Sequence, residues 1–172
     1  TVEVACVVDE DVDFFASKTS HQLLSSTIGV GEAETLILGL HFILKPGWKV
    51  YWRSPGDAGY PPSIDWKGST NLSDAKMLWP APQRFSVLGL ETLGYKNEVL
   101  YPIVVRLQSP GEALYAVANI DYLTCNDIWI IKGVDKCFSC ISNICFGRFI
   151  TIVIRIPNQF DGHLIATKHG NL

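Results

Sequence analysis

The sequence predicts an all-β domain, and three observations lead to that fold class. Short runs rich in β-branched and aromatic residues recur from residue 21 onward, and residues 35–44 (TLILGLHFIL) form the longest of them. Turn signals built from proline and glycine separate these runs. No segment before residue 125 shows an apolar stripe with the 3.6-residue period of a helix. Many short strands joined by regular turns are typical of a sandwich or a barrel.

The individual elements follow from the same signals. Residues 35–44 end at a Lys-Pro-Gly sequence, and apolar side chains then alternate in residues 48–52 (WKVYW). Because Pro-Gly suits the central positions of a tight turn, we predict a hairpin here. Residues 53–62 contain three prolines and two glycines, so we predict irregular structure for them. Further strands are predicted at residues 63–66, 75–79, 99–107 and 113–124.

The composition is that of a folded domain. Apolar residues make up 48 % of the 172 residues and charged residues 18 %, which excludes a disordered chain. A net charge of −3 does not favour binding to nucleic acid, which is itself negatively charged. The most apolar stretch, residues 141–156, is interrupted by Arg148 and Arg155, and its end (TIVIRI) suits a strand better than a membrane helix. From the acidic residues near its start, we also expect no secretory signal in this sequence. We therefore expect neither nucleic-acid binding nor direct membrane insertion of this chain.

A change in composition near residue 130 divides the chain. Residues 1–130 hold 9 Lys and Arg against 15 Asp and Glu, whereas residues 131–172 hold 5 against 2. We predict an acidic leader without a clear period at residues 1–19 and a β-sandwich at residues 20–130. Residues 131–172 form a divergent, cysteine-containing tail, for whose structure the sequence makes no prediction.

The chain has an odd number of cysteines, which leaves at least one outside any intrachain disulfide. They are Cys6, Cys125, Cys137, Cys140 and Cys145. This count suits a thiol-exchange protein better than a structural disulfide scaffold. Cys137 and Cys140 form a Cys-x-x-Cys motif, but no βαβ pattern surrounds it, and its spacing to the other tail residues fits no zinc module. We therefore expect no metal and no cofactor.

Three strings in the chain carry a family resemblance. They are LGLHFILKPGWKVYWRSPGDAGYPPSIDW (38–66), LWPAPQRFSVLGLETLGYKNEVLYPI (78–103) and DYLTCNDI (121–128). They resemble the N-terminal domain of the DsbD/ScsB disulfide reductases, and ScsB-like members more than DsbD itself. The resemblance implies an immunoglobulin-like β-sandwich in the periplasm. It also implies thiol:disulfide interchange, a protein-disulfide reductase activity. In the relay that the resemblance implies, a cysteine pair takes electrons from a membrane-embedded thiol-transfer domain and passes them to soluble periplasmic thioredoxin-fold proteins.

The resemblance also implies the site residues. The family pattern is Cys-x-x-x-Cys, following a strand that ends in Asp-Tyr. Cys125 matches the first cysteine, but Trp129 occupies the second position. Thiol–disulfide exchange needs a second thiol to resolve the mixed disulfide, so we predict that the relay is impaired. Phe85 lies where the family carries a cap loop, which implies that it covers Cys125; the alternative is an ordinary loop aromatic.

Several interpretations of Cys125 remain open. It pairs with a tail cysteine, Cys137 or Cys140 being the first candidates, or it acts alone as a trapping thiol, or the chain is a degenerate or sequence-damaged copy. The sequence favours the last of these. A buried and inert Cys125 is a further alternative, because free cysteines are often buried. A non-catalytic immunoglobulin-like module that binds a partner in the cell envelope is the alternative function.

Overall fold

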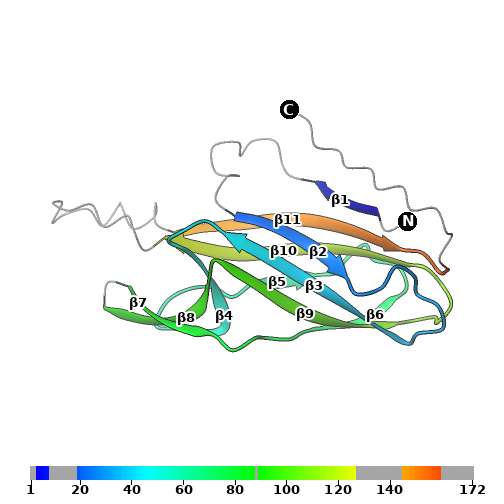
Figure 1. Ribbon diagram of the computed structural model, residues 1–172, viewed down its shortest axis with the longest axis horizontal. Coiled ribbons are helices and arrows are strands. Elements are labelled where there is room, and N and C mark those ends of the chain that lie inside the picture. Colours follow the sequence, from blue (N-terminus) through cyan, green and yellow to red (C-terminus); the bar gives the residue numbers. More distant parts are fainter. Residues whose placement is uncertain (1–2, 8–18, 88, 127–144, 160–172) are drawn as a thin grey trace.

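The chain folds into two antiparallel β-sheets packed face to face (Figure 1). The computed structural model describes residues 3–7, 19–87, 89–126 and 145–159, with the backbone alone at residues 3–7, 87 and 145–148. In these residues every regular element is a strand, and none forms a helix with the length and hydropathy of a membrane span. The predicted all-β sandwich is therefore confirmed.

The larger sheet is built around β10 (Leu114–Asn126). The strand order is β1-β11-β10-β4-β8-β7, and β5 also pairs with β10. Beside β10, this sheet consists of β1 (Glu3–Val7), β11 (Cys145–Ile156), β4 (Trp48–Gly56), β8 (Leu90–Lys96), β7 (Gln83–Val87) and β5 (Ser63–Asp65). β11 pairs with β10 from Leu114 to Cys125, while β5 and β4 share the other edge of β10. The last residues of β10 therefore lie between β11 and β4.

The smaller sheet has the order β2-β3-β9-β6. Its strands are β2 (Thr19–Ser25), β3 (Thr35–Leu44), β9 (Glu98–Leu107) and β6 (Leu72–Met77). Along β9, buried positions alternate with more exposed ones. This period of two is typical of a strand with one face on the core and one towards solvent.

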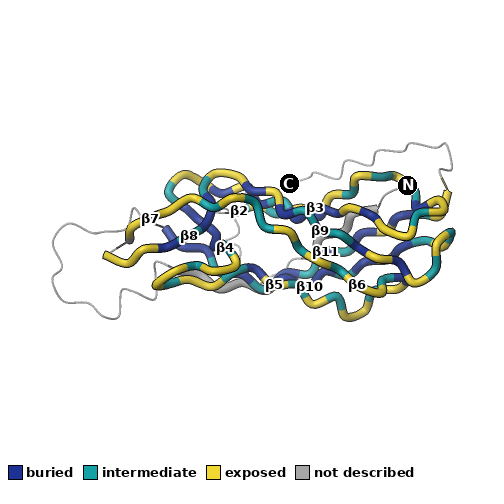
Figure 2. Tube along the Cα trace, turned by 90° about the horizontal axis from the view of Figure 1, so that it is seen from below, coloured by how far each residue is buried: buried dark blue, intermediate teal, exposed yellow. Residues whose placement is uncertain are grey.

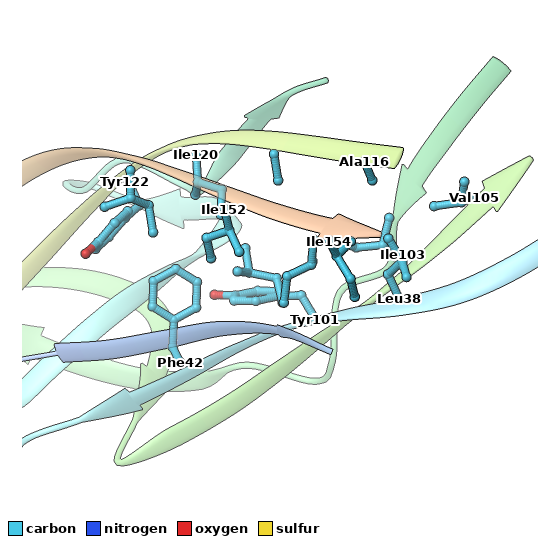
Figure 3. Packing of buried hydrophobic residues seen from close by; sticks show 14 of the residues in the cluster. Leu38, Phe42, Tyr101, Ile103, Val105, Ala116, Ile120, Tyr122, Ile152 and Ile154 are labelled. Carbon is cyan, nitrogen blue, oxygen red and sulfur yellow. The ribbon is translucent and has the colours of Figure 1, made fainter. Parts of the chain in front are cut away.

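The core fills the space between the two sheets, and the buried residues of Figure 2 line it. Phe42 of β3 packs edge-on against Tyr101 of β9 and Tyr122 of β10, with ring centroids 5.9 and 5.0 Å apart (Figure 3). The Tyr101 hydroxyl donates a hydrogen bond to the backbone oxygen of Tyr51 at 3.2 Å. Burial raises the pKa of the Tyr101 phenol well above its ordinary value. Tyr101 therefore ties the smaller sheet to β4 of the larger one.

The predicted hairpin at residues 35–52 is wrong, although the turn itself is present. Gly47 has φ of +83°, and the Trp48 N–H donates to the Lys45 oxygen at 3.0 Å. However, β3 pairs with β2 and β9, whereas β4 pairs with β10 and β8. The turn carries the chain from one sheet to the other. A Pro-Gly sequence fixes only local geometry, so it fits this connection as well as a hairpin.

The strands also extend further than the sequence suggests. Residues 53–56, predicted to be irregular, continue β4 beyond a register shift between Tyr51 and Gly56. Pro55 is accommodated there because an irregular ladder does not need every backbone N–H. At the other edge of the sheet, β1 and β11 pair with each other. The sheet therefore takes in residues on both sides of the range 20–130.

Candidate functional site

Cys125 lies near the end of β10, on the face of the larger sheet that points away from the core. Side chains alternate between the two faces of a strand, and Ile120 and Tyr122 belong to the core. Thr124 and Asn126 continue that inward series, so Cys125 projects outward. Its exposed fraction is nevertheless only 2 %. Other side chains must therefore cover the sheet at this point.

Two lysines lie in one row with Cys125 across neighbouring strands. Cys125 is the register partner of Lys49 on β4, and Lys49 is the partner of Lys96 on β8. Directly opposed residues of antiparallel strands project on the same face, with Cβ atoms about 4.5–5.5 Å apart. We call these three residues the Cys125 row. Figure 1 shows β4, β8 and β7 gathered at this end of the molecule.

Phe85 of β7 lies against the same row. Its ring centroid is 5.4 Å from the Lys49 ammonium nitrogen and 4.5 Å from that of Lys96. Phe85 is 8 % exposed, and its backbone oxygen accepts a hydrogen bond from the Thr92 hydroxyl at 3.4 Å. The family resemblance implied that Phe85 lies in a cap loop and covers Cys125, with an ordinary loop aromatic as the alternative. In the structure, Phe85 belongs to a strand and contacts the lysines next to Cys125.

Close backbone approaches fix β4 against β8 beside the row. A Cβ atom on Gly94 would lie 2.3 Å from the backbone oxygen of Val50, and one on Gly56 would lie 2.3 Å from that of Glu91. The Asp57 carboxylate accepts the Glu91 N–H at 2.9 Å, and the Asp57 N–H donates to the Glu91 oxygen, also at 2.9 Å. These contacts hold β4 against β8 on both sides of the register shift, Gly94 on the side of the two lysines and Gly56 and Asp57 on the other.

Cys125 is disulfide-bonded. The side chains of the other four cysteines lie outside the described part of the chain, but the backbone of β1 and β11 places two of them. Cys145 on β11 is the direct register partner of Cys125. Opposed Cα atoms of antiparallel strands are about 4.5–5.5 Å apart, within the limit of about 7 Å for a disulfide. Cys145 therefore meets the backbone requirement for a bond to Cys125.

Cys6 does not meet this requirement. It pairs with Ile152, which lies seven residues beyond Cys145 on β11. At about 3.3 Å per residue, this places Cys6 some 23 Å further along the sheet than Cys145.

The other sequence-predicted residues at this site cannot be placed. Trp129, Cys137 and Cys140 fall in residues 127–144, outside the described residues. Sequence reasoning also overlooked Cys145 as the first candidate partner. The strand-like run that follows it was the available signal, because a strand there can bring Cys145 beside β10.

Elsewhere among the described side chains, a histidine and a glutamate lie within hydrogen-bond distance of each other. His41 Nε2 and Glu98 Oε1 lie 2.7 Å apart on the smaller sheet, away from the Cys125 row. No group of three or more His, Cys, Asp or Glu side chains in the described ranges is placed to hold a metal ion. The Cys125 row with Phe85 is therefore the candidate site.

Two comparisons with known proteins found a match, one to a family model and one to a solved structure. The family model for the N-terminal part of the thiol:disulfide interchange protein DsbD matches residues 21–130. The crystal structure of the N-terminal periplasmic domain of ScsB from Proteus mirabilis is similar, with a TM-score of 0.58 and 27 % identity over 87 % of this chain. The match covers 49 % of that ScsB chain, so this chain spans about half its length. No curated protein matches. Because the family model covers more than half of the residues, the chain belongs to the family of DsbD N-terminal thiol:disulfide interchange domains.

Proposed function

We propose that this chain is a periplasmic thiol–disulfide interchange domain in which Cys125 and Cys145 form the redox pair. The observation that carries the proposal is the position of Cys125. It is disulfide-bonded, it is buried on the outer face of the sheet, and it lies opposite Cys145. By family, the electron donor is a membrane-embedded thiol-transfer domain, and the acceptors are soluble thioredoxin-fold proteins.

The exchange has two halves. A donor thiolate attacks one sulfur of the Cys125–Cys145 disulfide, the S–S bond breaks, and a mixed disulfide forms. The second donor thiol then attacks the donor sulfur of that mixed disulfide. The donor leaves with an internal disulfide, and the domain has gained two electrons and two protons. In the second half, the Cys125 thiolate attacks the acceptor disulfide, and Cys145 then attacks the Cys125 sulfur. The acceptor leaves with two thiols, and the domain disulfide is restored.

The substitution at Trp129 removes the family's second cysteine but not the second thiol. A cysteine on the neighbouring strand can resolve the mixed disulfide from a position far away in sequence. Cys145 is in register for this role, whereas Cys137 and Cys140 have no described position. On this proposal the relay, which the sequence alone predicts to be impaired, has kept its chemistry with a relocated partner.

A thiol count on the folded protein tests the proposal. The oxidised protein is incubated with excess reduced thioredoxin, alkylated without unfolding, and analysed peptide by peptide. We expect two newly alkylated thiols, at Cys125 and Cys145. If Cys125 gains no label before the protein is unfolded, the domain does not exchange, and the non-catalytic binding module becomes the better account.

Phe85 provides a further prediction. If its ring covers the redox pair, Phe85→Ala will expose the disulfide and raise its rate of reduction by dithiothreitol several-fold, since exchange depends on access to the sulfur. To measure that rate, the reaction is stopped at intervals with an alkylating agent, and the alkylated fraction of Cys125 is determined at each time. Leu90→Ala is the control, because Leu90 is 45 % exposed at the same β7–β8 hairpin. Equal rates in Phe85→Ala and the parent protein would make Phe85 an ordinary packed aromatic.

A further inference from the structure

Lys49 is unusual for a lysine. Its exposed fraction is 1 %, and among the side chains that the structure describes it is the only buried one that carries a formal charge. Burying an ammonium group is costly unless nearby groups compensate the charge. Lys49 is also the residue of β4 directly opposite Cys125. A buried lysine is thus paired in register with the sulfur that reduction of the disulfide releases as a thiol or a thiolate.

We propose that Lys49, with Lys96 beside it, stabilises the thiolate of Cys125 and makes this buried thiol reactive at neutral pH. This inference rests on the proposed function and adds positioning residues to it. They act through the charge they present to Cys125.

The physical problem is that a covered thiol is normally a poor nucleophile. Burial in apolar surroundings raises the pKa of a thiol, and the thiolate is the species that attacks. Cys125 is 2 % exposed, and Phe85 lies against the lysines beside it. A cation within about 4–6 Å favours the charged form and lowers the pKa of such a group by about 1–3 units. A neighbouring ammonium group can therefore offset the effect of the cover.

The other charged and titratable groups on this face are few among the described residues. Facing outward with Cys125 are Lys49 and Tyr51 of β4, Lys96 of β8 and Asp121 of β10, while the neighbouring outward positions of β7 are Gln83 and Phe85. Asp121 is four residues from Cys125, about 13 Å along an extended strand. The two lysines are nearer in register, so the field at Cys125 from these groups is positive in sign.

Phe85 gives the row a second function. Its ring contacts both ammonium groups, and cation–π contacts hold cations against an aromatic face. Phe85 therefore helps to keep the lysines on the outer face of the sheet, next to Cys125.

The test is the pH dependence of alkylation at Cys125. The full chain is reduced, treated with iodoacetamide between pH 5 and 10, and the labelling rate is read from the Cys125 peptide by mass spectrometry. In Lys49→Met, which keeps an unbranched side chain one atom shorter but removes its charge, we expect the midpoint of the profile to rise by about one pH unit or more. Lys96→Met should shift it in the same direction by less.

Two controls separate charge from packing. Lys49→Arg keeps the charge and should restore the parent midpoint. Lys76→Met removes an exposed lysine of β6 on the other sheet and should leave the midpoint unchanged. If Lys49→Met and Lys96→Met both keep the parent midpoint, the inference is wrong while the proposed function stands. If Cys125 of the reduced parent protein remains unlabelled throughout the pH range, the proposed function fails as well.

Discussion

Cys145→Ser is expected to convert the domain from an exchanger into a trap. When the reduced protein meets oxidised glutathione, the Cys125 thiolate attacks it, forms a Cys125–glutathione disulfide and releases one glutathione thiolate. In the parent protein, Cys145 then attacks the Cys125 sulfur and releases the second glutathione. Serine cannot make that attack, so the adduct should accumulate in stoichiometric amount. Intact-protein mass spectrometry follows the adduct over time.

The matched controls are the two other tail cysteines. Cys137→Ser and Cys140→Ser should behave like the parent protein, with a transient adduct and a restored disulfide. Cys125→Ser should form no adduct on the peptide that contains position 125. If the adduct instead persists in Cys137→Ser or Cys140→Ser and resolves in Cys145→Ser, the resolving thiol is Cys137 or Cys140, the first candidates named from the sequence.

Gly56→Ala should lower the free energy of unfolding by about 3 kcal/mol, because two penalties coincide. Gly56 has φ of +92°, where side chains other than glycine are strained, and its Cβ would lie 2.3 Å from the Glu91 carbonyl oxygen. That oxygen belongs to the β8 backbone and cannot rotate away. Urea-induced unfolding, monitored by tryptophan fluorescence, measures the change.

Gly89→Ala is the control for the backbone penalty alone. Gly89 has φ of +81°, close to that of Gly56, but no heavy atom lies within 4 Å of its added Cβ. Its cost should be about 1 kcal/mol. Equal losses in the two variants would show that the close contact at Gly56 relaxes freely, and would remove the argument that this contact holds β4 against β8.

Much of the fold can be predicted from local pattern. The longest apolar run became β3 with the predicted bounds, and residues 99–107 fall within β9. These strands succeed because alternation and turn residues act locally. The pairing of the strands was not predicted. The turn after β3 joins two sheets, and β11 pairs with β10 although the residues between them, 127–144, are not described. Which strands lie side by side depends on how all the strands together bury their apolar faces, and a local sequence pattern does not contain that information.

The residues of the candidate site also divide into those that the sequence predicts and those that it does not. Cys125 and Phe85 can be selected from the family strings, because each stands in a recognisable local sequence. Cys145 and Lys49 cannot, since their importance comes from register: one lies opposite Cys125 on β11 and the other on β4. In the sequence, Lys49 stands between Trp48 and Val50 in a predicted strand. A lysine at such a position is ordinarily exposed to solvent. Only the assembled sheet shows that it is buried beside a cysteine.

The central claim is that Cys125 and Cys145 form one disulfide that opens and closes in the folded protein. Peptide mapping of the oxidised, alkylated protein by mass spectrometry tests it most directly. We predict a linked peptide pair containing Cys125 and Cys145, which disappears when the folded protein is treated with reduced thioredoxin. A bond from Cys125 to Cys137 or Cys140, or a Cys125 that is alkylated without reduction, would contradict the account.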